Sequence, residues 1–143
     1  MPNDKPEAIR IVLGPDILAA SFFDPASKNV LDHWRNGAVR LIITRELLMT
    51  YLSTLRGLGL SDAQLRRWAM WFTSGDTADA DMDSGESGGA VPAMLARAAS
   101  GGAQCVVVNR AAWRDALSHE IAALDAATFL RKLAERQPDG ALP

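Results

Sequence analysis

Hydrophobic residues along this sequence form short, nearly continuous runs and longer periodic stripes, which predict different elements. The short runs are rich in β-branched residues and cover 9–13, 39–43 and 103–108. Runs of this length without regular polar alternation are typical of strands in a parallel sheet that helices cover on both faces. The pattern therefore predicts three buried parallel strands.

Between these runs, apolar residues recur at the spacing of amphipathic helices. The clearest stripe runs from Leu47 to Leu55 and ends at Gly57, and Ser61 with Gln64 forms a capping box before the next helix. Shorter stripes and helix-start residues predict the other helices, at 17–22, 30–34, 65–72, 92–100, 110–117 and 126–133, with Asn109 and Asp125 as N-caps of the last two. Alternating strands and helices predict an α/β fold, a three-layer α/β/α sandwich around a parallel central sheet.

One segment interrupts this alternation. Residues 74–91 contain Met82 as their only large apolar side chain, together with five acidic residues and several glycines. A segment of this composition buries too little apolar surface to order itself. We therefore predict a mobile loop over 74–91 within a single domain that spans residues 1–143.

Composition narrows the function classes. The chain has 143 residues, a formal net charge of -2 and a pI near 5.6, which disfavours nucleic-acid binding by bulk positive charge but allows a local basic patch. A single cysteine, Cys105, excludes an internal disulfide framework, and His33 and His119 have no second histidine or cysteine at metal-ligand spacing. With no apolar run of membrane-spanning length, the sequence predicts a soluble cytoplasmic protein.

The candidate chemistry lies where the predicted strands end. In open α/β sheets, ligands bind beyond the carboxyl ends of the strands. The first strand leads into Asp16, the second into Arg45 and Glu46, and the third into Asn109 and Arg110. We expect these side chains to gather at one edge of the sheet, where the simpler interpretation is that Asp16, Glu46 and Asn109 stabilise helix N-termini.

Five segments, in this order, resemble the PIN domain, and in particular the toxin branch related to the VapC ribonucleases. They cover nearly the whole chain outside 74–91: Ile-Val-Leu-Gly-Pro-Asp-Ile-Leu-Ala-Ala at 11–20, Val-Leu-Asp-His-Trp-Arg-Asn-Gly at 30–37, Leu-Ile-Ile-Thr-Arg-Glu-Leu-Leu-Met-Thr-Tyr at 41–51, Ala-Ala-Ser-Gly-Gly-Ala-Gln-Cys-Val-Val-Val at 98–108 and Thr-Phe-Leu-Arg-Lys-Leu at 128–133.

The resemblance implies a ribonuclease that cuts single-stranded RNA with Mg²⁺ or Mn²⁺ held by about four acidic side chains. The family's first metal-binding aspartate aligns with Gly14, and the asparagine two residues later aligns with Asp16. The second acid is kept as Glu46. The third acidic segment aligns with residues 88–91, which contain no acid, and the last acid aligns with Asn109 or Arg110.

Acidic residues at other positions of the chain would restore part of this site. Asp16 would replace the missing first ligand, and Asp83 and Glu86 would enter from the loop after an insertion of about five residues. The resemblance therefore implies Asp16 and Glu46 as catalytic residues, and Asp16, Glu46, Asp83 and Glu86 as ligands of Mg²⁺ or Mn²⁺. Arg45, Asn109 and Arg110 would bind the RNA substrate.

Three functions follow as hypotheses. The first is a PIN-like protein with a depleted acidic site that binds RNA or a protein partner without cleavage. The second is an active metal-dependent ribonuclease that uses Asp16, Glu46 and the loop acids. The third is a structural module that forms homo-oligomers or pairs with an antitoxin-like protein, through an aromatic helix at 65–72 that has more apolar surface than one buried face requires.

Overall fold

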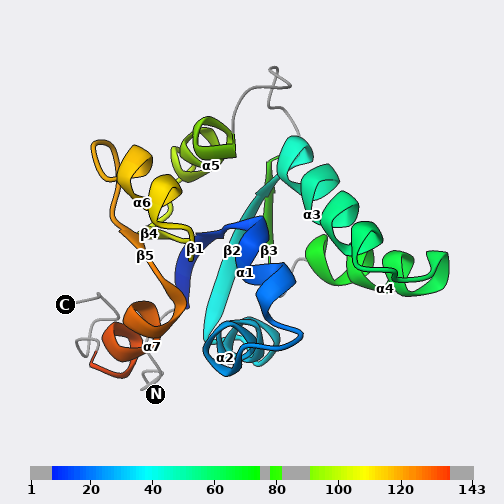
Figure 1. The fold of residues 1–143 in the computed structure, drawn as a ribbon. Helices are drawn as coiled ribbons and strands as arrows, with labels where there is room; N and C mark the ends of the chain where they lie inside the picture. Colours follow the sequence, from blue (N-terminus) through cyan, green and yellow to red (C-terminus); the bar gives the residue numbers. More distant parts are fainter. Residues whose placement is uncertain (1–7, 75–77, 82–90, 136–143) are drawn as a thin grey trace, which may run out of the picture.

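The computed structural model describes residues 8–74, 78–81 and 91–135 and shows an α/β fold (Figure 1). Its sheet has five strands, all parallel, in the order β3-β2-β1-β4-β5. The strands are β1 (Ile9–Leu13), β2 (Val39–Thr44), β3 (Ala78–Asp81), β4 (Cys105–Val107) and β5 (Ala123–Leu124). The predicted parallel sheet is therefore confirmed, with β1 at its centre.

Helices cover both faces of this sheet. They are α1 (Pro15–Ala20), α2 (Pro25–Arg35), α3 (Arg45–Gly57), α4 (Asp62–Phe72), α5 (Val91–Ala99), α6 (Ala111–Leu117) and α7 (Ala126–Ala134). Helix α5 packs on β1, β2 and β4 and lies next to α6, whereas α2 packs on β2, α1 and α7 (Figure 1). The described chain thus forms the three α/β/α layers that the sequence predicts.

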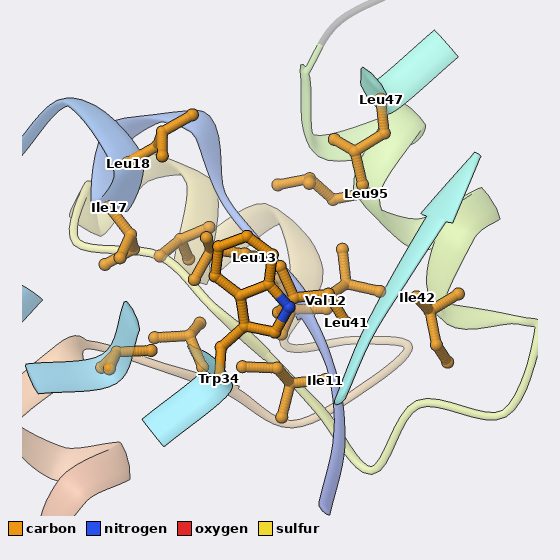
Figure 2. Close-up of a cluster of buried hydrophobic side chains, with 14 of the residues drawn as sticks. Ile11, Val12, Leu13, Ile17, Leu18, Trp34, Leu41, Ile42, Leu47 and Leu95 are labelled. Carbon is orange, nitrogen blue, oxygen red and sulfur yellow. The ribbon is translucent and has the colours of Figure 1, made fainter. Parts of the chain in front are cut away.

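The central strands are buried because each contributes side chains to both layers. Ile11, Leu41 and Trp34 lie together on one side of the sheet, whereas Ile42 points to the opposite side, towards α5 (Figure 2). All four side chains are buried. This two-sided burial explains why β1 and β2 are almost continuously apolar in sequence.

The aromatic residues of α4 pack within the protein rather than forming an exposed face. Phe72 is fully buried, with its ring centroid 5.3 Å from that of Trp34 and 4.9 Å from that of Tyr51. Trp68 and Trp71 are partly buried against the core. Packing within the chain thus covers Phe72 and part of Trp68 and Trp71, whereas Met70 of the same helix is exposed, and the partner interface predicted for this helix stays a prediction.

The segment predicted as a loop contains a strand. Residues Ala78–Asp81 form β3, which pairs in parallel with β2 at the edge of the sheet. The predicted loop over 74–91 is wrong for residues 78–81, whose sequence Ala-Asp-Ala-Asp has no apolar run that would indicate a strand. This strand forms through main-chain pairing with β2, which the pattern of its own residues does not predict. Residues 75–77 and 82–90 lie outside the described residues, so the prediction stays untested there.

Two predicted helix starts are confirmed. Ser61 and Gln64 form a reciprocal capping box at α4. The Asp125 carboxylate accepts a hydrogen bond from the Thr128 N–H at 2.8 Å, as an N-cap of α7. Hydrogen bonds from Thr128, with smaller contributions from Arg114 and Arg131, lower the pKa of Asp125 below its ordinary value of 3.8.

Replacing Asp125 with alanine is expected to reduce the free energy of unfolding by about 1 kcal/mol at neutral pH, the usual cost of losing an N-cap. Because the pKa is lower in the folded state, the charged cap contributes fully above pH 3.8 and is lost as the pH falls below it. Thermal unfolding of both proteins from pH 7 to pH 2 measures the difference. A difference in stability between the wild type and Asp125→Ala that stays constant below pH 3.8 would contradict this role. Asp125→Asn is the control, because asparagine caps a helix without titrating.

No helix in the described ranges combines the length and the apolar character needed to cross a lipid bilayer.

Candidate functional site

The predicted site residues follow three neighbouring strands that end at the same edge of the sheet. Asp16 lies in the first turn of α1 after β1, and Glu46 lies in the first turn of α3 after β2. Asn109 and Arg110 follow β4. Since β1 pairs in parallel with both β2 and β4, all four residues lie beyond the carboxyl edge of the sheet.

Gly14 occupies a position with no room for a side chain. Its N–H donates to the Val107 carbonyl at 2.8 Å, which holds the end of β1 against β4. A Cβ atom at this position would lie 2.4 Å from Val108 Cγ1 and 2.5 Å from Asp16 Oδ1. The space where the resemblance places a first metal-binding aspartate is therefore filled by Val108 and Asp16.

The Asp16 carboxylate is bound by backbone N–H groups. Oδ2 accepts hydrogen bonds from the N–H groups of Asn109 at 2.7 Å and Arg110 at 2.8 Å, and Oδ1 accepts one from Ile17 at 3.0 Å. Asn109 and Arg110 directly precede α6, whose N-cap residue Arg110 makes no side-chain capping bond. Asp16 therefore joins β1 to the start of α6.

The prediction that Asn109 caps α6 is wrong. Its side chain points to two other elements: Nδ2 donates to Ser27 Oγ at 3.0 Å, and Oδ1 accepts from the Ala126 N–H at 3.1 Å. Ser27 is fully buried, and both its N–H and its hydroxyl donate to Asp24. The Asn109 amide therefore links the end of β4 to the starts of α2 and α7.

Glu46 forms an ion pair that sequence reasoning did not identify. Arg97 Nη2 lies 2.7 Å from Glu46 Oε1 and 2.9 Å from Oε2, so both carboxylate oxygens accept from one guanidinium. The Glu46 side chain is only 11% exposed, which strengthens this pairing relative to an ion pair in open solvent. Arg97 is the one charged residue of α5, and a lone charge in an apolar helix is the signal that indicates such a partner.

Burial raises the pKa of two titratable side chains within the fold. The Tyr51 hydroxyl donates to the Leu13 carbonyl, and burial, with a smaller contribution from the Asp16 charge, raises its pKa far above the ordinary value. Burial also raises the pKa of the Cys105 thiol to about 12, which disfavours the thiolate form at neutral pH.

Arginine side chains flank the same edge. Arg45 is the first residue of α3 and is exposed. Arg110 is also exposed, and its guanidinium carbon lies 4.8 Å from the ring centroid of the half-buried Trp113. Arg114 Nη1 donates to the carbonyls of Asn109 and Val108, which fixes the turn between β4 and α6.

The described residues do not fit a pair of divalent metal ions. Within the ranges that the structure describes, no group of three or more His, Cys, Asp or Glu side chains is placed to hold a metal. The Asp16 and Glu46 carboxylates accept from groups of the protein itself, and Gly14 provides no ligand. Asp83 and Glu86 lie outside the described residues, so their assignment as ligands stays a prediction.

Comparisons of this chain with family models, with curated proteins and with solved structures find no match. The similarity to PIN domains therefore stays a prediction from the sequence segments described above.

Proposed function

We propose that this chain is a PIN-like module that binds single-stranded RNA at the carboxyl edge of its sheet and does not cleave it. The observation that carries the proposal is the state of the two acids kept at this edge. Asp16 accepts three backbone hydrogen bonds, and Glu46 is held by Arg97. Both oxygens of each carboxylate already accept hydrogen bonds from the protein, so a metal ion at this edge would compete with these donors.

The arrangement of Glu46 and Arg97 also changes the electrostatics of the edge. A guanidinium that donates to both oxygens of Glu46 supplies the positive charge that a metal ion would otherwise bring. With Glu46 neutralised by this pair, the edge repels phosphate less than a cluster of unpaired acids would. Binding of an RNA backbone then needs no cation from solution.

Exposed groups at the same edge match the chemistry of single-stranded RNA. Arg45 and Arg110 present guanidinium groups, which bind phosphate oxygens in bidentate geometry. The guanidinium of Arg110 and the ring of Trp113 lie against each other, and both arginine planes and aromatic rings are surfaces on which unpaired bases stack. Phosphate contacts and base stacking together favour a single strand over a duplex.

The test is fluorescence anisotropy with a labelled single-stranded RNA in the presence of EDTA. Wild-type protein is expected to bind, and the double variant Arg45→Glu/Arg110→Glu is expected to bind at least ten-fold more weakly, with a smaller dependence on salt concentration. Arg67→Glu, at an exposed position of α4, is the matched control and should retain wild-type affinity.

Two outcomes would contradict the proposal. One is wild-type protein that does not bind RNA in EDTA. The other is Mn²⁺-dependent cleavage of the same RNA that Glu46→Gln abolishes, which would instead support the active ribonuclease.

A further inference from the structure

Helices α3 and α4 carry most of the large hydrophobic side chains that are exposed within the described ranges. Met49 of α3 is 63% exposed, Met70 of α4 is 71% exposed, and Leu58, which caps α3, is 46% exposed. The two helices pack against each other (Figure 1), and every residue of both helices and of the loop between them is described. Apolar surface left open in this amount indicates a contact with another molecule.

A groove of about 380 Å³ lies between the two helices. Its described apolar residues are Leu52 of α3 and Leu65 and Ala69 of α4, and its described charged residues are Arg56, Asp62 and Arg66. Met49 precedes Leu52 by three residues and Met70 follows Arg66 by four, so each methionine lies on the same side of its helix as a groove residue. The apolar surface therefore continues from the groove along both helices.

The groove uses a different side of α4 from the aromatic cluster. Trp68 and Phe72 stack against Trp34 in the interior, whereas Arg66 and Ala69 face the groove. None of the described lining residues is aromatic. An aliphatic floor offers no ring on which an unpaired base can stack, but it suits the apolar side chains of a protein helix.

The charges beside this floor are mainly positive. Arg56 and Arg66 are exposed, and neither makes an ion pair with any group in the part of the chain that the structure describes. They outnumber Asp62, the one acid of the described lining, although the chain as a whole has a net charge of -2. The groove therefore has the opposite sign of charge to the rest of the molecule and attracts an acidic partner.

We propose that the groove between α3 and α4 binds an acidic amphipathic helix of a protein partner. Apolar residues at positions i, i+3, i+4 and i+7 of that helix contact Leu52, Leu65 and Ala69, and carboxylates beside them pair with Arg56 and Arg66. The flexible side chains of Met49 and Met70 adapt to the flanks of the bound helix. The surface includes neither Arg45 nor Arg110, so it does not depend on the proposed RNA binding.

Fluorescence anisotropy of the full chain tests the proposal with two labelled synthetic helices at constant ionic strength. Both carry leucines at i, i+3, i+4 and i+7; one has glutamates beside this face and the other has lysines at the same positions. The glutamate helix is expected to bind saturably, and about ten-fold or more tightly than the lysine helix. The double variant Arg56→Glu/Arg66→Glu is expected to reverse this order, and tight binding of the lysine helix shows that the variant is folded.

Two further variants separate charge from shape. Arg67→Glu, at a neighbouring exposed position of α4 outside the described lining, is the matched control and should bind the glutamate helix like the wild type. Ala69→Gln keeps both arginines but fills the floor with a polar side chain, so it should weaken the glutamate helix as well. Arg45→Glu/Arg110→Glu should leave helix binding unchanged, and Arg56→Glu/Arg66→Glu should leave RNA affinity unchanged.

The proposal is wrong if the glutamate helix does not bind the wild type, or if it binds Arg56→Glu/Arg66→Glu as tightly. It is also wrong if vesicles of phosphatidylserine bind the wild type while the glutamate helix does not, since the surface would then belong to a membrane contact.

Discussion

Gly14→Ala is expected to lower the free energy of unfolding by about 2–3 kcal/mol, the upper part of the roughly 1–3 kcal/mol that is usual for adding atoms to a filled interior. The added methyl would meet Val108 Cγ1 at 2.4 Å and Asp16 Oδ1 at 2.5 Å. Val108 is fully buried and Asp16 is held by three hydrogen bonds, so neither yields without loss of packing or bonding. Denaturant unfolding of the two proteins measures the difference.

Gly57→Ala is the matched control for this substitution. No atom lies within 4 Å of the corresponding Cβ position at Gly57, the last residue of α3. Alanine there is expected to leave stability unchanged or to raise it by up to about 1 kcal/mol. Equal effects at Gly14 and Gly57 would show that crowding at Gly14 is not what destabilises the protein.

Gly14→Asp would introduce the acid that the PIN resemblance places at this position. We expect it to destabilise the fold at least as much as alanine does, without creating a metal site. Mn²⁺ should therefore not raise the unfolding temperature of this variant. A saturable rise on adding Mn²⁺ would show instead that one restored acid is sufficient to hold a cation at this edge.

Asp16→Ala is expected to lower the free energy of unfolding by about 2–3 kcal/mol, and to do so in EDTA as well. The substitution leaves the N–H groups of Asn109 and Arg110 without their carboxylate acceptor, and hydrogen bonds to a charged group contribute more than neutral ones. It also removes a negative charge from the start of α6. Asp16→Asn keeps one acceptor oxygen, so its free energy of unfolding should lie between those of the wild type and Asp16→Ala. Denaturant unfolding measures all three.

Asp115→Ala, at an exposed position of α6, is the control for loss of a carboxylate and should change stability by less than about 0.5 kcal/mol. If Asp16 acted only as a metal ligand, its removal would leave stability in EDTA unchanged. That result would show that Asp16 does not stabilise the fold through its hydrogen bonds to Asn109 and Arg110.

Local sequence patterns were sufficient for the elements whose stabilising contacts lie within a few residues. The capping box at Ser61 and the N-cap at Asp125 use partners three residues away, so the sequence displays both partners together. The strands β1 and β2 were predictable because burial on both faces makes them apolar throughout.

The site was less predictable because its partners come from distant parts of the chain. Asn109 was a reasonable N-cap on local grounds, but its amide binds Ser27 and Ala126, which lie far away in sequence. Asp16, also distant in sequence, binds the backbone N–H groups of Asn109 and Arg110. The Glu46–Arg97 pair joins α3 to α5 across a separation that no spacing rule covers. Sequence reasoning placed both acids at the correct edge but did not show what they bind.

The central position of β1 has a consequence for biosynthesis. Ile11 pairs with Leu41 on one side and with Cys105 on the other. One partner strand of β1 is therefore synthesised soon after it, whereas the other is synthesised only after most of the chain. Until β4 leaves the ribosome, the nascent protein exposes an unpaired, strongly apolar strand edge. Such an edge either binds a chaperone or promotes aggregation. Translation speed between Thr44 and Cys105 therefore sets how long each new molecule is at risk.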